Sequence, residues 1–148
     1  MRDQTARTWV WVAIVVQFLG YVFDGLWHGL LRPGVEPTTV SEMTHHLLTV
    51  HLPLYIGAVA VLVTTSVTLV RKMPRAEAGT ALPIAWAGSA LSTSAEAWHA
   101  YSHLQLDTHH APLAGSLSAL GFFVVVVGMA VAGRTRRVDG ARHQRRAA

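Results

Sequence analysis

Acidic side chains and histidines recur in this chain three or four residues apart. The pairs are Asp24 with His28, Glu42 with His45, and Glu96 with His99. Residues at these spacings lie on one face of an α-helix, so each pair presents a carboxylate oxygen and an imidazole nitrogen side by side. The same combination on facing helices holds dinuclear iron and manganese sites in four-helix proteins. The spacing therefore predicts a metal site between helices.

Further histidines accompany these pairs and enlarge the set of candidate metal ligands. The set is Asp24, His28, Glu42, His45, His46, His51, Glu96, His99, His103, His109 and His110. A dinuclear centre takes fewer ligands, and the surplus would orient the others by hydrogen bonding. Iron or copper fits the mixed nitrogen and oxygen set, with zinc as a further possibility. The chain has no cysteine, which excludes thiolate ligands, and no residue is assigned a catalytic role.

Four long apolar runs carry or flank these residues, at about 8–31, 52–70, 81–104 and 112–133. A membrane-spanning helix needs about 20 mostly apolar residues, and only 14% of the chain is charged. We therefore predict an all-α integral membrane protein, a bundle of four transmembrane helices forming one domain over 1–133. A short outer helix is expected over 39–51, and the basic tail over 134–148 is expected to be flexible.

The basic residues predict how the chain crosses the membrane. Eleven of the twelve Lys and Arg residues lie before the first run, between the second and third, or after the fourth; Arg32 is the exception. Basic flanks stay cytoplasmic, so both termini should lie inside a multi-pass protein of the cell inner (plasma) membrane. Eight of the nine histidines then fall at the extracytoplasmic helix ends, and His143 lies in the tail. The basic charge also suits anionic lipid, so no nucleic-acid partner is expected.

Polar residues follow one face of the first and third runs. They are Gln17, Tyr21, Asp24 and His28 in the first, and Ser89, Ser92, Glu96, His99 and His103 in the third. Polar groups exposed to hydrocarbon are costly, so such stripes turn toward the interior of a bundle. We therefore expect Asp24 and Glu96 to face the interior of the bundle, about one turn below its outer surface.

The two halves of the chain resemble each other. Trp-His closes the first and third runs, and His-x-Pro-Leu opens the second and fourth. Two related hairpins would pack about a pseudo-two-fold axis along the membrane normal. The matching histidines, at similar depth around that axis, would be His28, His51, His99 and His110.

Those same four histidines allow an alternative cofactor, haem b. Facing helices of a four-helix bundle can hold haem between two histidines, here His28 with His99 or His51 with His110. Small residues could make room for the macrocycle: Gly20, Gly25, Gly88, Gly115 and Gly121. The carboxylates one turn away from the histidines speak against haem, which needs none there. A further alternative is a metal-binding or transport subunit of a larger membrane complex, and a homo-oligomer is also open.

Single features also have purely structural interpretations. Thr39 and Glu42 fit a capping box at a helix N-terminus, and a lone histidine beside a tryptophan is usually an interfacial anchor. The spacing His99-x3-His103 and the pairs His45–His46 and His109–His110 are similar to pieces of the histidine boxes of integral-membrane hydroxylases and desaturases. Those enzymes place their boxes at the cytoplasmic face, so we do not assign the chain to that family.

The ligand types indicate a reaction class. Iron or copper held by imidazole and carboxylate suggests redox or oxygenase chemistry. A centre at the membrane edge would act on a lipid-soluble or quinone-like molecule from the bilayer. The sequence thus predicts a metal-dependent oxidoreductase, with haem electron transfer and metal transport as the alternatives.

Overall fold

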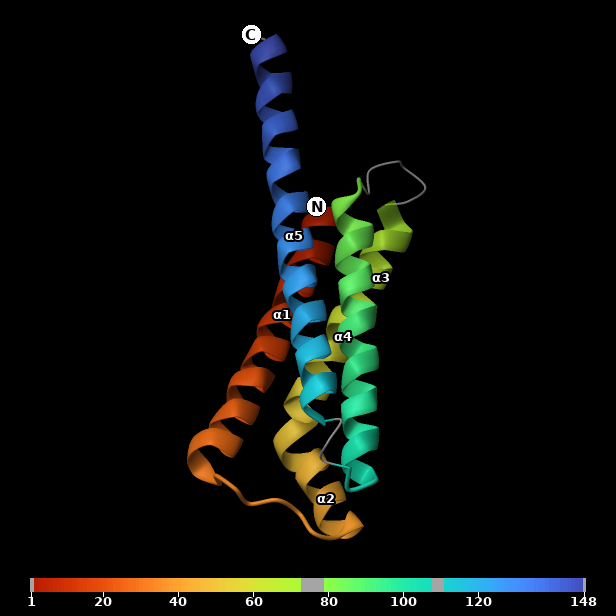
Figure 1. The fold of residues 1–148 in the computed structure, drawn as a ribbon. Coiled ribbons are helices and arrows are strands. Elements are labelled where there is room, and N and C mark those ends of the chain that lie inside the picture. Colours follow the sequence, from red (N-terminus) through yellow and green to blue (C-terminus); the bar gives the residue numbers. More distant parts are fainter. Residues whose placement is uncertain (1, 73–78, 108–110, 148) are drawn as a thin grey trace.

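The computed structural model describes residues 2–72, 79–107 and 111–147, which form helices and their connections, with no strand among them (Figure 1). The elements in order are α1 (Arg2–Leu26), η1 (Trp27–Leu31), α2 (Val40–His46), η2 (Leu47–His51), α3 (Leu52–Lys72), α4 (Ala81–Leu104) and α5 (Ala111–Ala147). The elements η1 and η2 are single π-helical turns. The prediction of an all-helical fold with four long helices is confirmed.

The four long helices run up and down between two ends of a bundle. The N-terminus, the end of α3 and the start of α4 lie at one end, here called the basic end (Figure 1). η1, α2, η2 and the last turns of α4 lie at the other, the α2 end. α1 packs against α3, α4 packs against α5, and α3 also packs against α4.

Helices α2, η2 and α3 form one continuous helical run from Val40 to Lys72. The sequence predicted instead a short outer helix over 39–51 and a separate helix from about residue 52; in the structure Pro53 lies inside the continuous run. A proline inside a helix lacks an N–H, and its ring would press on the carbonyl four residues earlier, that of Thr49. The wider π turn of η2 lies over this stretch and accommodates the ring without ending the helix.

Close contacts between backbones hold the helix pairs together. A Cβ atom added to Gly57 of α3 would meet the backbone of Gln17 in α1. A Cβ atom added to Gly121 of α5 would lie 2.6 Å from the carbonyl oxygen of Gly88 in α4. Glycine at such positions lets membrane helices approach until their backbones touch. The helix pairs therefore have fixed relative positions, which matters for side chains that must meet across them.

The bundle has polar residues inside and apolar residues outside. Gln17, Thr65 and Ser118 are completely buried, whereas the side chains of Phe18 and Phe123 are 52% and 64% exposed. Soluble proteins show the opposite preference. Within the part of the chain that the structure describes, three segments are long and apolar enough to cross a membrane: Gln4–Leu31, Val40–Lys72 and Pro112–Arg134. The fold is thus consistent with a membrane location.

Helix α4 is not among those three segments, although it spans the bundle over the length that the sequence predicted. Its polar residues lower its hydropathy, and many of them are buried: Ser89, Ser92, Glu96, Ser102 and His103. Helix α5 continues beyond residue 133 to Ala147. The flexibility expected for the segment 134–148 stays a prediction.

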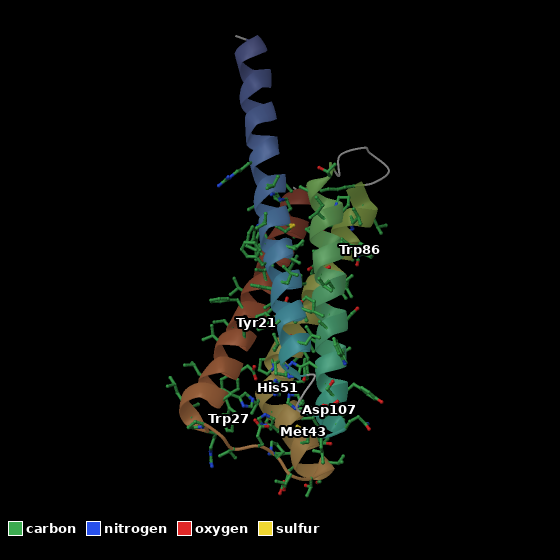
Figure 2. The ribbon with its side chains drawn as sticks, viewed as in Figure 1. Tyr21, Trp27, Met43, His51, Trp86 and Asp107 are labelled. Atoms are coloured by element: carbon green, nitrogen blue, oxygen red, sulfur yellow. The ribbon has the colours of Figure 1, made fainter. Side chains whose placement is uncertain are left out.

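The side chains that fill the interior differ between the two ends of the bundle. An apolar core fills the basic end, where Val10, Ile14, Val61, Leu82 and Met129 pack together. Figure 2 shows Trp86 toward this end, and Trp27, Met43 and His51 at the α2 end. The buried charged and imidazole groups at the α2 end form the candidate site.

Candidate metal centre

Five imidazole rings from η1, α2, η2 and α4 converge at the α2 end. Two groups of three each place one ligand atom per residue within 4.8 Å of the others. His28, His46 and His51 form the first group, here called the α1-side cluster. His51, His99 and His103 form the second, the α4-side cluster. Because His51 belongs to both, the two clusters are adjacent.

The π turn of η2 explains why His46 and His51 face the same way. In an α-helix, residues five positions apart point about 140° away from each other, because each residue turns by about 100°. A π turn bonds residue i to residue i+5, which returns the fifth residue close to the starting direction. Both side chains are buried, and their ring centroids lie 5.0 Å apart. An unbroken α-helix would have sent one of them outward.

Within each cluster, ring nitrogens approach one another closely. The Nε2 atoms of His99 and His103 are 2.7 Å apart, and those of His28 and His46 are 3.3 Å apart. Two neutral imidazoles can meet this way only by sharing one N–H between two nitrogens. A cation between them would use both lone pairs instead, which is how histidines coordinate metals.

Two carboxylates border the clusters. Asp24 Oδ1 lies 2.9 Å from His51 Nδ1 and 3.7 Å from His28 Nε2. The shorter contact lacks hydrogen-bond geometry, since both atoms are buried without a hydrogen-bond partner. On the α4 side, Glu96 Oε2 lies 3.9 Å from His99 Nδ1. Each cluster therefore has one carboxylate beside its imidazoles.

Buried polar atoms without hydrogen-bond partners concentrate at this site. Among the described residues they include Asp24 Oδ1, both ring nitrogens of His51, both carboxylate oxygens of Glu96, and Nδ1 of His99 and of His103. Leaving one such atom unsatisfied costs about 1–3 kcal/mol, and more where the group is charged. These atoms are the lone-pair donors that a metal ion requires, so a bound cation would satisfy several of them at once.

The structure brings together seven of the eleven residues predicted from sequence as ligands. They are Asp24, His28, His46, His51, Glu96, His99 and His103. His109 and His110 lie outside the described residues. His45 is exposed, although it is the immediate neighbour of the buried His46. Neither His45 nor Glu42 belongs to either cluster.

Glu42 is engaged in helix capping. Its Oε2 accepts hydrogen bonds from the backbone N–H groups of Thr38 and Thr39, at 3.0 and 3.3 Å. In return the Glu42 N–H donates to Thr39 Oγ1 at 3.2 Å, which completes the capping box. The structural interpretation of this motif is thus confirmed.

The polar stripes of α1 and α4 turn into the bundle interior as predicted, and there they meet. Gln17 Nε2 donates to Ser92 Oγ at 2.8 Å, and Ser92 Oγ lies 3.1 Å from Ser118 Oγ. Ser118 Oγ in turn lies 2.5 Å from the Tyr21 hydroxyl. This network crosses α1, α4 and α5 in the interior and fixes the helices that carry Asp24 and Glu96.

Tyr55 belongs to the site but was missed from the sequence. Its ring stacks on His51 at a centroid distance of 5.9 Å and an interplanar angle of 17°. Its hydroxyl is buried without a hydrogen-bond partner. The available signal was its position four residues after His51, which places both on one helix face.

A cavity of about 580 Å³ lies beside the α1-side cluster. Its wall includes Trp27, Arg32, Glu36, His45 and His46. His46 therefore borders both the cavity and the α1-side cluster.

Comparison of the chain with protein-family models, with functionally characterised proteins and with solved structures finds no match. The site must therefore be interpreted from its own chemistry. The chain is a helical bundle with apolar helices and buried histidine groups that could hold a metal ion.

Proposed function

We propose that the chain is an integral membrane metalloprotein with a dinuclear centre held by its two histidine clusters. The observation that carries this proposal is the pair of three-imidazole groups that meet at His51. With Asp24 on one side and Glu96 on the other, each ion would have nitrogen and oxygen donors at hand. Two ions would also balance the buried carboxylates, which are costly to hold alone.

The centre is proposed to lie at the extracytoplasmic edge of the membrane. The exposed apolar side chains of α1, α3 and α5 support insertion into lipid. Arg2, Arg7, Arg71 and Lys72 belong to the basic end, opposite the clusters (Figure 1). Since basic flanks stay inside, this charge distribution favours an outward-facing centre.

Copper or iron is the proposed metal, and redox chemistry the proposed reaction class. Imidazole binds copper, iron and zinc well, and the carboxylates add the harder donors that iron prefers. When bound, copper or iron would supply one-electron and oxygen chemistry. The cavity bordered by Trp27, Arg32 and His46 offers a route for a small lipid-soluble or quinone-like substrate. The support for this reaction class is the combination of imidazole nitrogen and carboxylate oxygen donors at the site.

Haem b is the alternative, and two features favour bare metal ions over it. A Cβ atom added to Gly20 or Gly88 would meet the neighbouring helix, so these glycines serve helix packing rather than a macrocycle. For the pair His28 and His99, the ring of His51 contacts both partners, at centroid distances of 5.6 and 5.4 Å, and would have to move for a macrocycle to lie between them. For the pair His51 and His110, the second residue lies outside the described residues.

Metal analysis of the full-length protein purified in detergent tests the proposal. We expect about two copper or iron ions per chain and a visible spectrum without a Soret band. The adjacent residues His46 and His45 provide a matched pair of variants, because only His46 belongs to a cluster. His46→Ala should lose metal and His45→Ala should retain it.

The other outcomes separate the alternatives. A Soret band would select haem. Metal that exchanges freely with chelators, without any turnover of a quinol or lipid substrate, would select a carrier or transport subunit. A folded protein that binds no transition metal, or that binds equally well in both variants, would overturn the proposal.

A further inference from the structure

We propose that the imidazole ring of His51 bridges the two metal ions, with Nδ1 binding the ion of the α1-side cluster and Nε2 binding the ion of the α4-side cluster. This inference rests on the proposed dinuclear centre and specifies how its two ions are joined. His51 would then bind two ions, whereas each of the other four histidines would bind one.

The position of His51 is the first argument. Its ring centroid lies 5.6 and 5.0 Å from those of His28 and His46. It lies 5.4 Å from both His99 and His103. No other described residue belongs to both clusters. A ring equally close to both groups is suited to donate to both.

The two ring nitrogens supply the second argument. His51 is only 1% exposed, and both of its nitrogens are buried without a hydrogen-bond partner. A buried histidine that serves packing normally donates its N–H to a carbonyl or carboxylate, which fixes the tautomer. Here the nearest acceptor, Asp24 Oδ1, lies 2.9 Å from Nδ1 but outside hydrogen-bond geometry. This leaves both nitrogens available as metal ligands.

The contact with Asp24 also orients the ring. Asp24 Oδ1 lies near His28 Nε2 as well, so Nδ1 of His51 faces the α1 side. The second nitrogen, Nε2, is left for the α4 side, where His99 and His103 provide the other imidazoles. The stacked ring of Tyr55 holds the plane of His51 in place.

Formation of such a bridge changes only the protonation of the ring. A neutral imidazole has one lone pair on one nitrogen and one N–H on the other. The first ion takes the lone pair, and the second ion replaces the proton, which leaves to solvent as the ring becomes imidazolate. No electron is transferred in this step. Because the two nitrogens are separated by a ring carbon, the ions would stand farther apart than the roughly 3.5–4 Å of common two-metal catalytic sites.

Electron paramagnetic resonance of the full-length protein in detergent, with Cu(II) as the probe metal, tests the bridge. Two Cu(II) ions joined by imidazolate are spin-coupled, so the integrated signal should fall well below the copper measured chemically. Replacing one of the ions by Zn(II) in the same wild-type protein should restore the signal of isolated Cu(II). This second measurement needs no variant and does not depend on whether a variant folds.

The variant His51→Ala should remove the coupling, with the remaining copper giving the full signal of isolated ions. His45→Ala should keep the coupling and serves as the matched control. Two bound Cu(II) ions with an undiminished signal in the wild-type protein would overturn the bridge while leaving the dinuclear centre standing. So would coupling that survives in His51→Ala. Failure of the wild-type protein to bind copper, iron or zinc would overturn the proposed function itself.

Discussion

At the scale of single residues, carboxylates with the same spacing to histidine have different surroundings. Asp24 is partly buried and contacts His51 and His28. Glu42 is exposed and accepts hydrogen bonds from Thr38 and Thr39. Spacing alone gave both the same prediction. The difference lies in burial, because an exposed carboxylate that already accepts the hydrogen bonds of a helix cap is not free to bind a metal ion.

Variants of Glu42 test this distinction. Glutamine can replace glutamate in a capping box, so Glu42→Gln should leave both the stability and the metal content unchanged. Glu42→Ala removes the carboxylate half of the capping box but keeps the Thr39 N-cap, so it should lower the stability only slightly, still with the wild-type metal content. Thermal unfolding and metal analysis are the measurements. Loss of metal from Glu42→Gln would show that its carboxylate is a ligand after all.

Asp24→Asn should weaken metal binding without disturbing the fold. The substitution keeps the shape of the side chain and removes the charge that faces His51 and His28. Changes to groups that orient or support metal ligands cost about 10–100-fold in affinity, and loss of a direct ligand should cost at least that. Chelator competition measures the change. The exposed Glu36→Gln is the control, and equal affinity in both variants would exclude Asp24 from the centre.

Residue spacing predicted part of the site and missed the rest for a physical reason. The steps of three and four in α1 and α4 correctly turned Gln17, Ser92 and Glu96 inward, because both helices are regular there. The sequence could not distinguish His46 from His45. That choice depends on the π turn of η2, whose hydrogen bonds leave no periodic signal in a five-residue segment.

At the scale of elements, the site depends on how closely α1 and α3 approach. Asp24 and His28 belong to α1 and η1, whereas His51 directly precedes α3. The contact of Gly57 with the backbone of Gln17 fixes the separation of the two helices. The α1-side cluster therefore requires a glycine outside it, six residues after His51 in the direction of the basic end.

Gly57→Ala should consequently destabilise the bundle and weaken the α1-side cluster. Its new methyl group would meet the Gln17 backbone, and overpacking of this kind costs about 1–3 kcal/mol. Gly25→Ala is the matched control, because nothing lies within 4 Å of a Cβ atom there. In a helix interior, that change should be neutral or stabilising by about 0.5–1 kcal/mol. Unfolding temperature and copper affinity should both fall in Gly57→Ala alone, and equal behaviour of the two variants would refute the argument.

At the scale of the whole molecule, the basic residues and the histidine clusters lie at opposite ends of the bundle. The order of basic and apolar segments in the sequence predicted this separation of the basic residues from the histidines. The two hairpins expected from the sequence correspond to the packing of α1 on α3 and of α4 on α5. The sequence could not predict how closely these helices approach, because the glycine contacts that decide it join residues far apart in the chain, such as Gly88 and Gly121. The internal repeat of two hairpins stays a prediction.

The orientation in the membrane can be tested directly, since the chain has no cysteine of its own. Gln4→Cys probes the basic end, and Val35→Cys probes the exposed segment between η1 and α2. The positive-inside rule predicts that a membrane-impermeant thiol reagent added to intact cells labels Val35→Cys. Gln4→Cys should react only after the membrane is opened. The reverse pattern would place the histidine clusters on the cytoplasmic side, where the metal supply and the available electron donors differ. Labelling of both variants in intact cells would contradict a membrane-spanning bundle, because the two positions lie at opposite ends of α1 and η1.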